Sequence, residues 1–165
     1  MSTICAYVTA CFRTSRPLVL AVLVALAVLL SGSIPRAYAA AEIPGDDDQD
    51  VLIRTTLMTF NDANMTNNYS VFFAKASKEF QAQITTEKMQ TAFEPFRKNE
   101  LYFEDVATAD YDSYEKAKLD NDGALVLAGV FKTDDMEVKY RIRYVQNNKL
   151  WKVLGINVDA TRKKQ

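Results

Sequence analysis

One stretch near the C-terminus alternates between apolar and charged side chains, and it constrains the fold more than any other feature. Its apolar members are Met136, Val138, Tyr140, Ile142 and Tyr144, and its charged members are Glu137, Lys139, Arg141 and Arg143. Successive side chains of a strand point to opposite faces, so the pattern predicts a strand with one buried face and one wet face. Such strands are typical of antiparallel sheets.

Turn-forming residues on either side extend this sheet. Residues 120–123 and 133–135 are rich in Asp, Asn and Gly, and the two asparagines at 147–148 predict a two-residue hairpin turn. The predicted strands between the turns cover residues 101–107, 111–119, 124–132, 136–144 and 150–158.

The N-terminal half supplies helices to cover the sheet. The first predicted helix places three apolar residues on one face, namely Ile53, Leu57 and Phe60. The second has an aromatic stripe over residues 69–80, and the third begins at Thr85 or Thr86 and ends or kinks at Pro95. The expected fold class is α+β: three N-terminal helices packed on a curved four- to five-stranded antiparallel sheet.

The first 39 residues have the pattern of a cleavable secretory signal. Arg13 and Arg16 precede an apolar run at 18–30, and small residues follow at Ala37 and Ala39. The run is shorter than the ~20 residues that a helix needs to span a bilayer. We therefore expect an exported protein, periplasmic or secreted, cleaved after Ala39 and without a stable membrane span, although an uncleaved anchor stays open.

The sequence after the signal divides into three parts. A polar lead covers residues 40–49, one domain covers 50–159, and a charged tail covers 160–165. The acids of the lead are expected to precede the first helix and to favour its N-terminal dipole.

The chain resembles the nuclear-transport-factor-2-like (cystatin-like) superfamily, most closely its small exported bacterial domains of unassigned role. The residues that show the resemblance are Phe60-Asn61-Asp62-Ala63, Tyr69-Ser70, Ser77 with Phe80-Gln81, Thr85-Thr86-Glu87, and Phe93-Glu94-Pro95-Phe96. The resemblance implies a cone-shaped fold and often a homodimer. It implies no particular reaction, since one fold hosts many functions.

Missing residue types exclude several chemistries. The chain has no histidine, and its two cysteines, Cys5 and Cys11, lie in the predicted signal. The domain therefore has no His-dependent hydrolysis, no thiol nucleophile and no His or thiolate metal site. The 120–123 turn lacks the closing acid of a calcium loop. We expect no metal, no cofactor, and no nucleic-acid partner, because the mildly acidic domain lacks a basic footprint.

The most specific functional hypothesis is an apolar pocket between the helices and the sheet. Its expected ligand-binding residues are Asn64, Tyr69, Phe73, Phe93, Tyr140 and Tyr144. Ligand sites are mostly apolar with a few polar groups, which Asn64 and the tyrosine hydroxyls would supply. The alternative that the same residues form a solid core stays open. The alternative that Asn64 only caps the end of its helix also stays open. No catalytic residue is assigned.

We expect a non-catalytic exported module that binds a small apolar ligand or a protein partner in the cell envelope. One alternative is a cofactor-free lyase or isomerase that pairs Asp62, Asp110 or Asp112 with a tyrosine. Another is a purely structural dimer. The wet face of the alternating strand offers an anion or partner patch, or a solvated face on which Glu115 and Glu137 pair with its cations.

Overall fold

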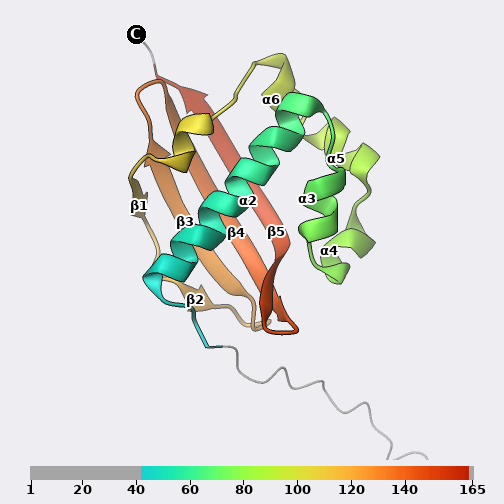
Figure 1. The fold of residues 1–165 in the computed structure, drawn as a ribbon, viewed down its shortest axis with the longest axis vertical. Coiled ribbons are helices and arrows are strands. Elements are labelled where there is room, and N and C mark those ends of the chain that lie inside the picture. The colour runs from blue at the N-terminus through green and yellow to red at the C-terminus, as the bar shows by residue number, and fades with distance from the viewer. Residues whose placement is uncertain (1–41, 164–165) are drawn as a thin grey trace, which may run out of the picture. The chain divides into compact units, whose positions relative to one another are not determined.

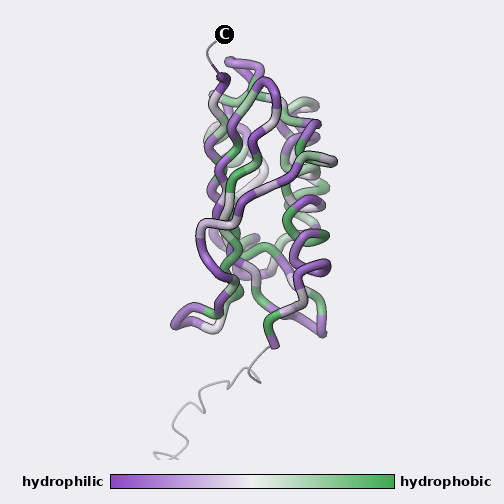
Figure 2. The backbone as a smooth tube through the Cα atoms, turned by 90° about the vertical axis from the view of Figure 1, so that its left-hand side faces the viewer, coloured by the Kyte–Doolittle hydropathy of each residue, from purple (hydrophilic) through white to green (hydrophobic). Residues whose placement is uncertain are grey.

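The computed structural model describes residues 42–163, and the predicted signal and its cleavage site lie outside them. Helices cover one face of an antiparallel sheet of five strands, so the predicted α+β class is confirmed. Figure 1 shows the longest helix running diagonally across the sheet, with the shorter helices beside it. In the side view of Figure 2, the sheet and the helices form two layers.

The long helix α2 (Asp46–Thr66) begins earlier than the sequence predicts. Asp46, Asp47 and Asp48 form its first turn, so these acids lie inside the helix and not in a lead before it. They still stabilise the positive end of the helix dipole. At the other end, Asn67 adopts a left-handed conformation (φ 51°), and its amide donates to helix carbonyls in a C-terminal cap.

The predicted aromatic helix at 69–80 is two short helices, α3 (Ser70–Lys75) and α4 (Lys78–Gln83). Ser77 separates them, because its hydroxyl accepts a hydrogen bond from the Phe80 amide (3.1 Å) and caps α4. The Ser77 amide donates to the carbonyl of Val153 in the sheet (2.9 Å). Three predicted helices therefore become five α-helices within residues 42–163.

The third predicted helix is divided at the proline. The Thr85 hydroxyl caps α5 (Thr86–Ala92) at 3.3 Å from the Lys88 amide, as the sequence predicts. Pro95 lies in the first turn of a further helix, α6 (Glu94–Lys98), where its missing amide hydrogen costs nothing.

The predicted strand at 101–107 is wrong. This segment is a loop with a 3-10 helix, η1 (Glu104–Ala107), because side chains of α2 bind its backbone groups. The Asn61 carboxamide oxygen accepts from the Phe103 amide (3.0 Å). Arg54 donates to the carbonyls of Val106 (2.6 Å) and Ala109 (3.0 Å).

The sheet has the strand order β1-β3-β4-β5, and β2 also pairs with β3. The predicted strand at 111–119 is interrupted, so that β1 (Tyr111–Ser113) and β2 (Lys118–Leu119) pair with different parts of β3 (Leu125–Lys132). β3 is central and buried on both faces except at its last residue, as its apolar sequence predicts.

β4 (Met136–Asn147) and β5 (Leu150–Arg162) form the long hairpin of the sheet. Its turn residues are Asn148 and Lys149, both with positive φ, one position later than predicted. Residues 160–162 belong to β5 and pair with the start of β4, so the predicted tail is part of the sheet up to there. The register shifts between Arg143 and Tyr144, an irregularity that bends a strand.

The core lies between the helices and the sheet. Leu57 and Phe60 of α2 belong to the same core cluster as Phe131, Val138 and Ile142 of the sheet, and all five are fully buried. Within the described part of the chain, none of the helices combines the length and the apolar character needed to cross a bilayer.

Candidate functional site

An open apolar groove lies between α2, α3 and the β4–β5 hairpin, with a volume of about 290 Å³. Its lining residues are Val51, Leu52, Thr55, Thr56, Thr59, Phe72, Lys75, Tyr144, Leu150, Trp151, Lys152 and Val153. The side chains of Val51 and Leu150 are 61% and 62% exposed. Large apolar side chains left in water beside a groove are typical of a binding surface.

Tyr144 joins the two walls of the groove. Its hydroxyl donates to the Leu52 carbonyl (3.0 Å) and lies 3.0 Å from the Thr56 hydroxyl, so β4 is tied to α2. Burial raises the pKa of Tyr144, with the Thr56 hydrogen bond as an opposing contribution. The hydroxyl therefore stays protonated and has a structural partner.

The polar groups of the groove are hydroxyls and ammonium groups. Lys75 donates to the Thr59 hydroxyl (3.1 Å), and Lys152 lies half-buried on β5. No acid is among the lining residues, and within residues 42–163 neither ammonium group lies within 4.0 Å of a carboxylate. The groove therefore combines an apolar wall with positive charge.

The six residues predicted to line one pocket lie in separate places. Asn64 and Tyr69 are together and buried: the Tyr69 hydroxyl donates to the Asn64 carboxamide oxygen, and Arg97 donates to that hydroxyl (3.2 Å). Phe93 stacks on Tyr69 with ring centroids 6.0 Å apart. Asn64 also donates to the Phe60 carbonyl (3.0 Å), so its polar groups are used inside the core.

Tyr140 lies in another part of the core, against Phe131 at 5.6 Å between ring centroids. Its hydroxyl is buried and has no hydrogen-bond partner among the described residues. The ring lies over Gly129, where an added Cβ would be 2.5 Å from the hydroxyl oxygen. Burial, followed by the neighbouring Tyr111, raises the pKa of Tyr140.

Phe73 is half-buried on α3, and its carbonyl accepts from Gln81 (2.8 Å). Of the six predicted residues, Tyr144 lines the groove. The ligand-binding role of the other five stays a prediction. Among them, Phe93 packs on Phe60, Tyr140 packs on Phe131, and Phe73 is partly buried against the core.

The outer face of the sheet is an array of ion pairs. Arg141 pairs with Glu115, which also pairs with Lys118 (2.7 Å), and Lys139 pairs with Glu137 (2.8 Å). Hydrogen bonds from Lys118 and then Arg141 lower the pKa of Glu115. These contacts agree with the alternative of a solvated, paired face, although Glu137 pairs with Lys139 of its own strand β4 and not across strands as predicted.

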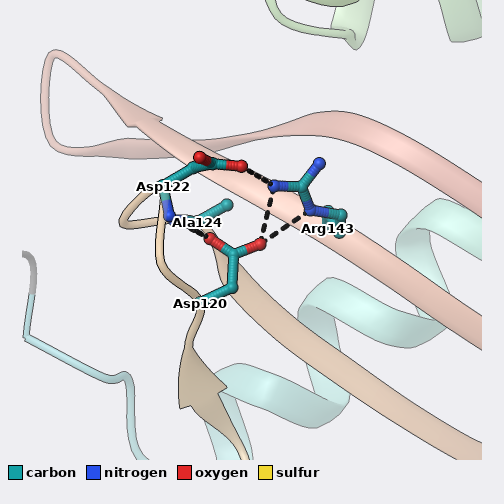
Figure 3. A network of polar contacts seen from close by, with 4 residues as sticks. All are labelled: Asp120, Asp122, Ala124 and Arg143. Carbon is teal, nitrogen blue, oxygen red and sulfur yellow. Dashed lines mark hydrogen bonds and ion pairs between the residues drawn. The ribbon is translucent and has the colours of Figure 1, made fainter.

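Figure 3 shows the part of this array in which Arg143 reaches the 120–123 turn. Its guanidinium lies 2.6 Å from Asp120 and 2.9 Å from Asp122, and the Ala124 amide donates to Asp120 (3.0 Å). These contacts close the β2–β3 hairpin turn.

A second, wider cavity of about 500 Å³ lies beside the start of α2. Its lining includes acidic and basic residues, namely Asp46, Glu115 and Lys116, together with Tyr111 and Ser113. Because charges of both signs line this cavity, it favours no single class of ligand. The groove, by contrast, is lined by apolar residues and positive charge.

The predicted acid–tyrosine pairs are not formed among the described residues. Asp62 and Asp110 are exposed, and Asp112 pairs with Lys132 (3.1 Å). In the part of the chain that the structure covers, no three acids gather in a way that could hold a metal ion.

The groove cannot be predicted from the sequence because its walls come from segments that are far apart in the chain. In the sequence, Leu150 and Trp151 follow a turn and are predicted only as the start of a strand. Val51 comes before the first residue of the predicted apolar helix face. Comparison of the chain with family models, with curated proteins and with solved structures gives no match.

Proposed function

We propose that the domain is a non-catalytic binding module of the cell envelope, and that the groove holds a small apolar ligand. The observation that supports this most is the exposure of Val51 and Leu150 on opposite walls of one groove. Its volume of about 290 Å³ is near the lower end of the ~300–1,000 Å³ typical of ligand pockets.

Two observations favour binding over catalysis. The hydroxyl of Tyr144 is engaged by α2, and the acids considered as bases, Asp62, Asp110 and Asp112, are exposed. A carboxylate base in an apolar site would need burial to raise its pKa, and exposed acids lack it. We also propose that the protein is exported and that it belongs to the nuclear-transport-factor-2-like superfamily.

The single tryptophan makes the test specific, because Trp151 lines the groove. We expect decanol to change Trp151 emission in a saturable way. Replacing an exposed wall residue, in Val51→Ser or Leu150→Ser, should weaken binding with little loss of stability. Tyr114→Ser is the matched control, because Tyr114 is 52% exposed outside the groove.

Unchanged emission at decanol saturation would contradict the proposal. Equal weakening by Tyr114→Ser would indicate non-specific adsorption. A protein partner, or a purely structural dimer, would then be the remaining explanation of the exposed apolar side chains, and sedimentation of the protein alone would identify a dimer.

A further inference from the structure

The positive charge of the groove points to one class of ligand. Resting on the function proposed above, we infer that the groove binds a single-chain amphiphilic anion, an alkyl carboxylate. Its chain would lie along the Val51 and Leu150 walls, and its head group would lie at Lys75 or Lys152.

The first support is charge complementarity. The domain carries more acids than bases after the predicted cleavage, yet the groove has two lysines and no acid among its lining residues. On the outer face, by contrast, Arg141, Arg143 and Lys118 all have carboxylate partners. The groove lysines lack such partners within residues 42–163, so an incoming carboxylate would not have to displace one.

The second support is the shape of the lysine side chains. Lys152 is half-buried and lines the groove. A lysine in such a position can lay its methylene groups on apolar surface and keep its ammonium group in water. Lys75 is held by the Thr59 hydroxyl, which limits the freedom it would lose on binding an anion.

The third support is size. A groove of about 290 Å³ has room for one alkyl chain and is small for a two-chain lipid. A single-chain anion in monomeric form is therefore the ligand to which the inference commits, and not a membrane surface.

Three ligands with the same chain and different heads test the inference: decanoate, decanol and decyltrimethylammonium, each below its micelle concentration. Followed by Trp151 emission, decanoate should bind about fivefold to tenfold more tightly than decanol, and the cation should bind more weakly. The preference for decanoate should shrink as salt is raised.

The matched variants are the double substitution Lys75→Gln with Lys152→Gln, and the control Lys88→Gln, which removes an exposed lysine of α5 outside the groove. The double variant should bind decanoate no better than decanol and should keep its decanol affinity. Lys88→Gln should behave as the unmodified protein. The two single variants report which lysine meets the head group.

The outcomes separate the inference from the function on which it rests. Equal affinity for decanoate and decanol would overturn the inference and leave the groove as a neutral apolar site. No binding of either would overturn both. Binding only to anionic vesicles would indicate a membrane surface as the ligand in place of a monomeric anion. Binding only to an acidic peptide would indicate a protein partner. Should the double variant not fold, the salt dependence of decanoate binding still decides.

Discussion

At the scale of single residues, the contact between Gly129 and Tyr140 shows how a strand position is restricted to glycine. The two residues are directly opposed on β3 and β4, and the Tyr140 ring lies across the glycine. A Cβ at Gly129 would be 2.5 Å from the Tyr140 hydroxyl oxygen and 2.7 Å from the Asp112 carbonyl oxygen. The second atom is backbone, so it cannot simply rotate away.

We therefore predict that Gly129→Ala lowers the free energy of unfolding by about 1–3 kcal/mol, as overpacking of a core does. Urea unfolding measures this. Gly155→Ala is the control, since a Cβ there would be 3.9 Å from its nearest neighbour, and it should be close to neutral. Equal effects of the two substitutions would show that strand glycines as such, and not this contact, determine the loss.

Two buried tyrosines predict opposite effects of losing a hydroxyl. Tyr144→Phe leaves the Leu52 carbonyl and the Thr56 hydroxyl without their partner and should cost about 1 kcal/mol. Tyr140→Phe removes a hydroxyl that has no partner in the described chain, and should be neutral or stabilising. Thermal unfolding of both variants checks this, and a large loss for Tyr140→Phe would show that the hydroxyl has a partner, either the Ser113 side chain or a bound water or ligand.

At the scale of elements, the sequence predicts best where a pattern is local. The alternation at 136–144 and the proline at Pro95 depend only on strand pleating and on a missing amide hydrogen, and the structure has β4 and the α5–α6 break there. The segment 101–107 depends on Asn61 and Arg54, which are far away in sequence. The sequence pattern of a segment cannot reveal that side chains of another element form hydrogen bonds with its backbone groups.

The β2–β3 turn gives a prediction about pH. Burial would raise the pKa of Asp120, but hydrogen bonds from the Ala124 amide and Arg143 outweigh it and lower the pKa below its ordinary value. A lowered folded pKa adds stability above the unfolded value of about 3.9, and that stability is lost as pH falls through the folded pKa.

Asp120→Asn keeps an oxygen for the Ala124 amide and removes the charge. We expect it to cost about 1 kcal/mol at neutral pH, because a partly exposed ion pair is screened by water. The difference in the free energy of unfolding between Asp120→Asn and the unmodified protein should narrow below about pH 4, because Asp120 itself becomes protonated there. Asp122→Asn is the control, since Asp122 is 79% exposed and should matter less. A difference that stays constant down to strongly acid pH would exclude the charge as its origin.

At the scale of the whole molecule, the candidate site is less predictable than the fold. The sequence identifies Tyr144 as a pocket residue, but for an interior pocket, whereas the groove opens at the side of α2. Its walls meet only when the hairpin turn at Asn148 and Lys149 brings Leu150 and Trp151 against α2 and α3. Aromatic stripes report which residues are buried, and they do not report whether the space between them is filled.

Removal of the predicted signal should leave the folded domain intact. The helical domain begins at Asp46, so cleavage after Ala39 would remove none of the described core. Exported protein should therefore begin Ala40-Ala41-Glu42. N-terminal sequencing of the exported protein measures this. Ala39→Arg should block cleavage, because the peptidase needs a small residue there, while Glu42→Gln should not. An intact Met1 in a membrane fraction would show instead that the segment stays attached as an anchor.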